Sequence, residues 1–156
     1  MADYTPDTSS KSTHTHRPPV LTGDLDLDLK ARQILTLSEG FLDAFGLIGV
    51  ETMRDADKQS QHWLDRQNRK IDGALKAMNA LAKAVERESE FLIGNVLTIA
   101  DIAGVCAVEM LDLRGMREGW RKGMPELARY CGRLGERKTF AETRPVMFDL
   151  RQGSIV

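Results

Sequence analysis

Three ionisable residues of this sequence could take part directly in chemistry: Glu39, Asp43 and Arg114. Glu39 and Asp43 are four positions apart in a segment with helical periodicity, so one helix face would carry both carboxylates. Either carboxylate could act as a general base, and the guanidinium of Arg114 could hold an anionic group of a substrate. A structural explanation is equally open, in which the carboxylates face water and Arg114 suits the negative end of a helix dipole.

We expect these residues to belong to the wall of a small-molecule pocket. The wall would come from the start of a first long helix and from the C-terminal end of a central helix that ends at Arg114. A cavity with an apolar or aromatic lining and a few polar groups is the usual form of a ligand site. The predicted ligand-binding residues are Thr36, Glu39, Gly40, Asp43, Met110, Arg114 and Trp120, with Asp112 nearby.

Other patterns that carry chemistry are weak in this sequence. It contains no glycine-rich phosphate loop, metal-ligand cluster or Ser/His/Asp set, so we predict no metal site. His14 and His16 would bind a divalent cation only weakly, because no second pair of ligands is near them. The cysteines Cys106 and Cys131 lack CxxC spacing. Cys106 falls in an apolar helix and is predicted to be a small core residue.

Composition limits the class of protein. The chain has 156 residues, of which 42% are hydrophobic, and this is enough for the core of one domain. The formal net charge of −1 excludes a general nucleic-acid or anionic-membrane surface, which needs a basic excess. No uninterrupted apolar run has the length of a membrane span, and the N-terminus carries no secretion signal. These features predict a reduced, cytoplasmic protein with no nucleic-acid or membrane partner.

The chain divides into three parts. Residues 1–24 are rich in Thr, Ser, Asp and Pro without apolar periodicity, and they are predicted to form a disordered tail. Residues 25–150 are predicted to form one helical domain, and residues 151–156 a C-terminal tail. Leucine and aspartate alternate over residues 25–29, as in a strand, but a single short strand would have no partner. We therefore predict an extended lead-in to the first helix there.

The predicted fold class is all-α, a helical bundle. Apolar residues recur at helical spacing over about residues 29–54 and again over about residues 57–88, which predicts two long helices. After the central helix, Pro125 opens another helix at the position where its missing N–H is harmless. Phe140 marks a short final helix that stops before Pro145. No segment alternates long enough, with turn signals, to build a sheet.

Glycines interrupt the first long helix at positions 40, 46 and 49. Glycine inside a helix costs about 1 kcal/mol relative to alanine, so a packing reason is expected for keeping it. Gly40, Gly46 and Gly49 are predicted to allow a bend or the close approach of a partner helix.

The central helix has the clearest start signal in the chain. Thr98 is a good N-cap, and Asp101 follows three residues later, so the two form a predicted capping box whose loss in Asp101→Ala would cost about 1 kcal/mol. Residues 102–113 are apolar except for Glu109 and Asp112, which predicts a helix surrounded by other helices. Glu109 must be paired, protonated or at the surface, and an arginine partner or exposure is favoured over catalysis.

A series of motifs in the second half of the chain carries a resemblance to a known family. They are Leu92 to Gly94, Thr98 to Asp101, Trp120-Arg121, Pro125 to Leu127, Arg137, Phe140, Thr143 and Pro145. In this order they resemble the all-helical C-terminal domain of glutathione S-transferases. Residues 32–37 and 65–67 also look like bacterial and fungal members, and the likeness covers roughly residues 25–150.

The resemblance implies mainly a fold. In that family the thiol-activating residue and most glutathione contacts lie in a separate thioredoxin-like domain. Residues 1–24 are too few for such a domain and lack its pattern, so no catalytic residue is carried over to this chain. The helical domain of the family normally contributes the pocket wall for an apolar, electrophilic co-substrate. No cofactor is therefore predicted, and glutathione is expected only if a partner chain supplies its site.

The expected function is that of a stand-alone domain that binds an apolar small molecule or a protein partner without activating glutathione. The alternative is an enzyme acting on an apolar small molecule, of isomerase, cyclase or lyase type or related to glutathione transferases. The face that would pack on a thioredoxin-like domain should be apolar, and such a face is costly unless it is covered. A homodimer or a separate partner chain is expected to cover it.

Overall fold

The computed structural model describes residues 20–85 and 89–146. Every regular element in these two ranges is a helix, and neither range contains a strand, so the predicted all-α class is confirmed. Most of the predicted N-terminal tail and the whole predicted C-terminal tail lie outside the described residues. The elements are α1 (Leu25–Thr52), the 3-10 helix η1 (Ala56–Lys58), α2 (Gln61–Val85), α3 (Ile99–Arg114), α4 (Trp120–Gly123), α5 (Pro125–Gly135) and α6 (Lys138–Glu142).

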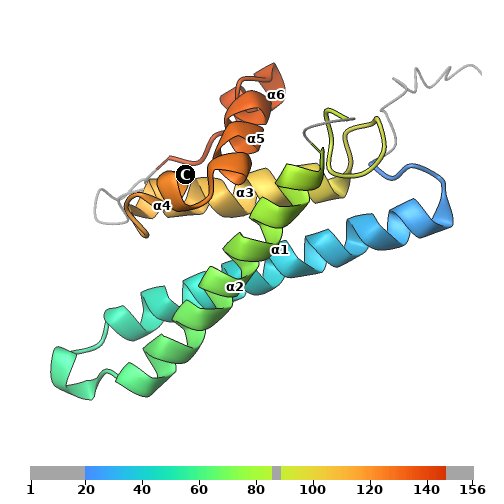
Figure 1. Cartoon of the computed structure of the whole chain (residues 1–156). Helices are drawn as coiled ribbons and strands as arrows, with labels where there is room; N and C mark the ends of the chain where they lie inside the picture. Colours follow the sequence, from blue (N-terminus) through green and yellow to red (C-terminus); the bar gives the residue numbers. More distant parts are fainter. Residues whose placement is uncertain (1–19, 86–88, 147–156) are drawn as a thin grey trace, which may run out of the picture.

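The three long helices α1, α2 and α3 form the frame of the domain. Helices α1 and α2 form a long antiparallel hairpin, and α3 lies beside α1 and runs in the same general direction (Figure 1). A small buried cluster joins Ala31 and Ile34 of α1 to Ala100, so the starts of α1 and α3 are neighbours. Helix α5 contacts both α2 and α3, and the side chain of Asn79 on α2 accepts from the N–H of Leu127, 3.0 Å away.

Helix α1 begins earlier than the leucine pattern predicts. Asp24 caps it by accepting a hydrogen bond from Leu27 N at 3.0 Å, and Asp28 accepts from both the N–H and the hydroxyl of Thr22 at 2.7 Å. Carboxylates at a helix start satisfy free N–H groups and suit the positive end of the dipole. The prediction of an extended lead-in over residues 25–29 is therefore wrong, because its aspartates serve the first turn of a helix.

Two other element boundaries differ from prediction. The second long helix begins at Gln61 instead of Asp57, because the 3-10 helix η1 turns the chain before it. The loop predicted after the central helix contains the short helix α4, which starts at Trp120. Pro125 at the start of α5 and the short helix around Phe140 agree with prediction.

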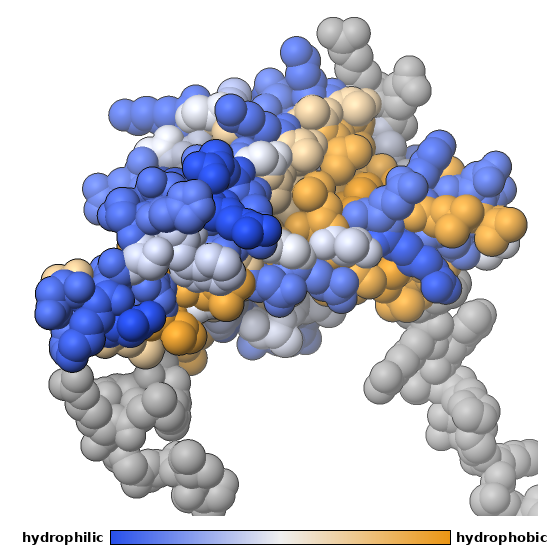
Figure 2. All heavy atoms as spheres, turned by 90° about the horizontal axis from the view of Figure 1, so that it is seen from below, coloured by the Kyte–Doolittle hydropathy of each residue, from blue (hydrophilic) through white to orange (hydrophobic). Residues whose placement is uncertain are grey.

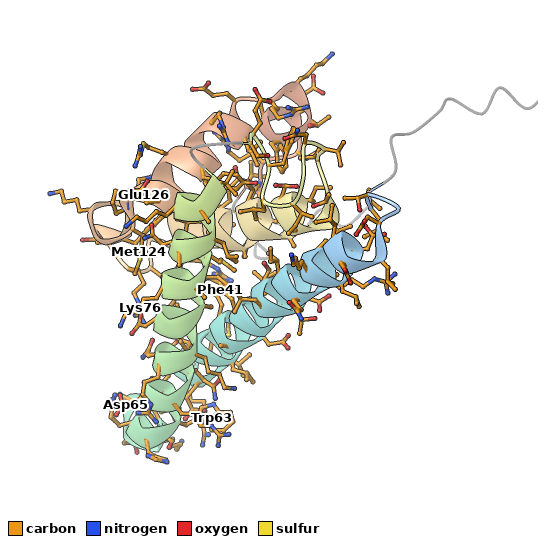
Figure 3. All side chains as sticks on the ribbon, turned by 45° about the vertical axis from the view of Figure 1, so that its right-hand side comes forward. Phe41, Trp63, Asp65, Lys76, Met124 and Glu126 are labelled. Atoms are coloured by element: carbon orange, nitrogen blue, oxygen red, sulfur yellow. The ribbon has the colours of Figure 1, made fainter. Side chains whose placement is uncertain are left out.

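The main core lies between α1, α2, α3 and α5. Its largest side chains that are at most 1% exposed are Phe41, Ile71, Val105, Val108 and Leu111. Figure 3 shows Phe41 inside the angle between α1 and α2, whereas Trp63 and Asp65 lie at the tip of the hairpin. The hairpin thus buries one face over its length and leaves its tip to solvent.

Helix α3 is buried on one face only. Its side toward α1 and α5 is closed, but Ile102 is 36% exposed and Cys106 is also exposed. The predictions that α3 is surrounded by helices and that Cys106 is a core residue are therefore wrong. An apolar composition does not distinguish a helix enclosed on all sides from one with an open apolar flank.

Helix α1 is the one described helix that is long and apolar enough, by length and composition alone, to cross a bilayer. The prediction that no segment reaches this length overlooked it, because charged, polar and glycine residues break every uninterrupted apolar run in it. Its buried residues, including Phe41 and Ile48, belong to the main core with α2 and α3. A core helix of a soluble protein passes the same length test.

Candidate functional site

The predicted site residues do not form one wall. Because α1 and α3 run in the same direction, the start of α1 lies beside the start of α3 and not beside its end (Figure 1). Thr36 and Gly40 line a groove between α1 and α2, whereas Arg114 lines a pocket at the C-terminal end of α1. Trp120 lines a third hollow, which is formed by the loop after α3. The predicted meeting of the start of the first helix with the end of the central one is wrong.

One of these hollows lies where α1 and α3 both end. It has a volume of about 440 Å³, and Arg114 is the one charged residue in its lining. Its other lining residues are Phe45, Gly46, Ile48, Gly49, Val50, Thr52, Met53 and Met116. We call it the C-terminal pocket.

Gly46 and Gly49 leave space in the C-terminal pocket because they have no side chains. A Cβ atom built on Gly46 or on Gly49 would meet no atom within 4 Å, and the same holds for Gly40. The predicted close approach of a partner helix at these glycines is therefore wrong. Instead, Gly46 and Gly49 leave open space above α1, and a larger side chain there would project into the pocket.

The electrostatics of the C-terminal pocket are mixed. The ends of α1 and α3 both present C-terminal carbonyl groups, which carry partial negative charge and disfavour an anion. Arg114 in the last turn of α3 opposes that charge, whereas the last turn of α1 has no basic residue. The arrangement favours a mainly apolar molecule with one hydrogen-bond acceptor for the guanidinium.

The groove between α1 and α2 is smaller and has two cationic residues in its lining. It has a volume of about 310 Å³ and contains Thr36 and Gly40 opposite Arg69 and Lys70. Glu39 and Asp43 are exposed on α1 and line neither this groove nor the C-terminal pocket. Their role as general bases remains a prediction that this placement does not support.

Trp120 and Asp112 belong to a structural network. The indole N–H of Trp120 donates to Asp112 Oδ1 at 3.0 Å, and Arg121 donates to both carboxylate oxygens at 2.6 Å. Partial burial acts to raise the pKa of Asp112, but the hydrogen bonds from Arg121 and Trp120 outweigh it and hold that pKa below its usual value. The Arg121 guanidinium also lies 4.7 Å from the centre of the Trp120 ring. Trp120 is thus already engaged by protein groups, and Met110 packs against the main core.

Glu109 is paired, as predicted. Arg144 Nε donates to its Oε1 at 3.2 Å, at the edge of a hollow of about 300 Å³ that Cys131 also lines. Burial, together with the charge of Glu109, raises the pKa of the Cys131 thiol to about 12. Cys106 is exposed, but partial burial and then the charge of Glu109 also raise the pKa of its thiol. Neither thiol is thereby activated as a nucleophile.

The capping box is present at the start of α3. Thr98 accepts from the N–H of Ala100 at 3.3 Å, and Asp101 Oδ2 accepts from Thr98 N at 2.7 Å and from Thr98 Oγ1 at 2.9 Å. Asp101 Oδ1 also accepts from Leu92 N at 2.7 Å and from the hydroxyl of Tyr130. Local spacing revealed the first set of contacts, but no local signal pointed to Leu92 or Tyr130.

Sequence reasoning also missed most of the C-terminal pocket. Gly46 and Gly49 of α1 were a usable signal, but sequence reasoning interpreted them as sites of a bend or of helix packing. Met116 and the loop after α3 carried no signal at all. Among the residues that the structure describes, no group of three or more His, Cys, Asp or Glu side chains could hold a metal ion.

Comparisons with known proteins agree with this architecture. Residues 61–133 match the family model of the glutathione S-transferase C-terminal domain. The chain is 33% identical over 129 residues to the uncharacterized GST-like protein YibF of Escherichia coli (strain K12), covering 82% of this chain and 61% of that protein.

Two solved structures show the same likeness in three dimensions. A glutathione S-transferase of Methylobacterium radiotolerans, in complex with glutathione sulfonate, is 35% identical with a TM-score of 0.77, over 85% of this chain and 61% of that one. A glutathione S-transferase of Methylobacillus flagellatus with bound glutathione is 25% identical with a TM-score of 0.75, over 84% and 64%. The chain thus spans about three fifths of the length of these proteins. Its described helices form a glutathione S-transferase C-terminal-like domain.

Proposed function

We propose that this domain binds an apolar small molecule in the C-terminal pocket. The observation that carries the proposal is the set of lining side chains, which are apolar apart from the hydroxyl of Thr52 and the guanidinium of Arg114. The volume of about 440 Å³ lies within the usual range for ligand sites, roughly 300–1,000 Å³. Apolar area that a ligand removes from water would supply about 25 cal/mol per Å².

Filling the pocket tests the proposal. The purified chain is titrated with the neutral fluorophore N-phenyl-1-naphthylamine, and the dissociation constant is compared with that of Gly49→Leu. The new side chain enters space that no other atom occupies, so the fold should persist while the probe loses its site. Gly40→Leu, on the same helix but outside the pocket, is the matched control. We expect at least a tenfold weaker affinity, about 1.4 kcal/mol, for Gly49→Leu alone. Equal binding by both variants would overturn the assignment.

The role of Arg114 is tested by changing the charge of the probe. The anionic fluorophore 8-anilinonaphthalene-1-sulfonate should lose affinity in Arg114→Met, because its sulfonate loses the guanidinium while the helix carbonyls remain. The neutral probe should bind Arg114→Met about as well as it binds the unmodified chain. A parallel loss for both probes would mean that Arg114 supports the pocket without recognising charge.

A second candidate function is that of the co-substrate half of a glutathione-dependent enzyme. Two similar transferases favour this function, because their structures contain glutathione or glutathione sulfonate. This chain spans about three fifths of their length. The glutathione site would then come from a thioredoxin-like domain outside the described helices. On glutathione-agarose we expect no retention of this chain alone, and firm retention would overturn the assignment of the glutathione site to a separate domain.

We further propose that a second copy of the chain covers the apolar residues exposed at the two ends of one face of α1. Leu25, Leu29, Leu47 and Val50 are between 40% and 75% exposed. Leu29 and Leu47 are roughly five helical turns apart, so they share one face. Figure 2 shows one side of the molecule, on which hydrophobic atoms gather in a patch between hydrophilic ones. Sedimentation of the unmodified chain and of Leu29→Glu should give a dimer and a monomer, respectively. A monomeric unmodified chain would instead favour a separate partner.

A further inference from the structure

The loop between α3 and α4 has an unusual backbone. Arg117 has φ of 58° and is the one non-glycine residue with positive φ in the described part of the chain. Gly115 and Gly119, two positions on either side, have φ of 61° and 78°. Glycine adopts this left-handed conformation freely, but a side chain with a Cβ atom rarely does. Contacts elsewhere must therefore hold Arg117 in place.

Those contacts cross to α2. Arg117 Nε donates to Asp72 Oδ1 at 2.9 Å, and Arg117 Nη2 donates to Asn68 Oδ1 at 2.8 Å and to the Asn68 carbonyl oxygen at 3.4 Å. Asn68 and Asp72 are one helical turn apart, so the planar guanidinium hydrogen-bonds two successive turns of α2. Only 29% of the Arg117 side chain is exposed. We call this set of contacts the Arg117 clamp.

The Arg117 clamp lies next to the C-terminal pocket. Met116, the preceding residue, lines that pocket, and its N–H donates to the Leu111 carbonyl at 2.9 Å. The Arg117 carbonyl in turn accepts from Trp120 N at 2.9 Å, at the start of α4. Met116 is thus held to α3 by its N–H and to the main core by its side chain, and the next residue, Arg117, holds the strained loop to α2.

We propose that Arg117 is a positioning residue that sets the pocket wall formed by Met116 and so limits the size of the ligand. This inference rests on the proposed binding function. With the clamp intact, the loop has one conformation and the pocket one shape. Without it, the left-handed backbone relaxes, Met116 leaves its place, and the pocket accepts bulkier molecules while it holds small ones less well.

Probe selectivity tests the proposal. Affinities for N-phenyl-1-naphthylamine and for the bulkier bis-ANS are measured for the unmodified chain and for Arg117→Ala. If the ordered loop is populated about a tenth of the time in the variant, the dissociation constant of the small probe rises about tenfold. We expect the affinity ratio to shift by about that factor toward the bulkier probe. Asp72→Ala, which removes one partner from α2, should shift the ratio less, and Glu118→Ala in the same loop not at all.

A second measurement does not depend on binding. In the chain labelled with ¹³C-methyl methionine, the Met116 resonance is assigned with Met116→Leu. It should move or broaden in Arg117→Ala and stay unchanged in Glu118→Ala. An unchanged resonance in Arg117→Ala would overturn the positioning role.

The two proposals fail in different ways. If the Met116 resonance responds but Gly49→Leu does not weaken the small probe, the pocket assignment fails while Arg117 still positions Met116. If Gly49→Leu abolishes binding but Arg117→Ala keeps the affinity ratio, the role in ligand size is overturned and the pocket stands.

Discussion

The hydroxyl of Tyr130 on α5 donates a buried hydrogen bond to the carboxylate of Asp101 on α3, and 29 residues separate the two in sequence. Asp101 is completely buried and also accepts from Leu92 N, Thr98 N and Thr98 Oγ1. One carboxylate thus joins the loop before α3, the first turn of α3 and the middle of α5. A buried carboxylate is tolerated when its oxygens accept several hydrogen bonds in this way.

Asp101→Ala should destabilise the domain by more than a lost helix cap. The sequence-based expectation was about 1 kcal/mol, but the substitution leaves four donors without their acceptor, and each buried unsatisfied group costs roughly 1–3 kcal/mol. We expect a loss of at least about 3 kcal/mol in the free energy of unfolding, measured by urea denaturation. Glu118→Ala, at an exposed loop position, should change it by less than about 0.5 kcal/mol. A loss near 1 kcal/mol would show that only the cap matters.

Tyr130 should make the domain less stable in alkali. Burial raises the pKa of its phenol, and the charge of Asp101 raises it further. The neutral phenol is therefore favoured by folding, so its contribution is complete below about pH 10 and is lost as the pH rises further. In Tyr130→Phe, the fall of the unfolding free energy above about pH 10 should be shallower by up to about 1.4 kcal/mol per pH unit. Tyr4→Phe, in the predicted tail, is the control, and equal slopes in all three proteins would contradict this assignment.

The two cysteines should differ in reactivity. Cys106 is exposed, whereas Cys131 is half-buried and its pKa is raised to about 12. Because the thiolate is the reactive form, Ellman's reagent at pH 8 should modify Cys106 first. Cys106→Ser should remove the faster phase, and Cys131→Ser should leave it. Equal rates for the two single variants would mean that the hollow beside Cys131 opens readily in solution.

Gln67 should be replaceable with a gain in stability. Its side chain is completely buried on α2, and no protein group of the described residues hydrogen-bonds its amide oxygen or nitrogen. A buried polar group without a partner costs about 1–3 kcal/mol. Gln67→Met, of similar shape and without the amide, should raise the unfolding free energy by a similar amount. Ile71→Met, one turn away in the same core, is a packing control, and a loss of stability in Gln67→Met would contradict the expected cost.

Features that depend on neighbouring residues were predictable. The capping box of Thr98 and Asp101, the start of α5 at Pro125 and the short helix around Phe140 follow from contacts within one helical turn. The motifs that resemble glutathione transferases likewise predicted the fold that the structure has. The pairing of Glu109 followed from a general cost, because a carboxylate in an apolar helix needs a partner.

Other features depended on how the helices meet. Composition marked α3 as central, but only its packing against α1 and α5 decided that Cys106 faces solvent. The parallel course of α1 and α3 separated Glu39 and Asp43 from Arg114 and brought Gly49 and Met116 to the same pocket. Sequence periodicity specifies which residues share a helix face, because that depends on 3.6 residues per turn. It does not specify which ends of two helices are neighbours, because that depends on the free energy of packing whole faces together.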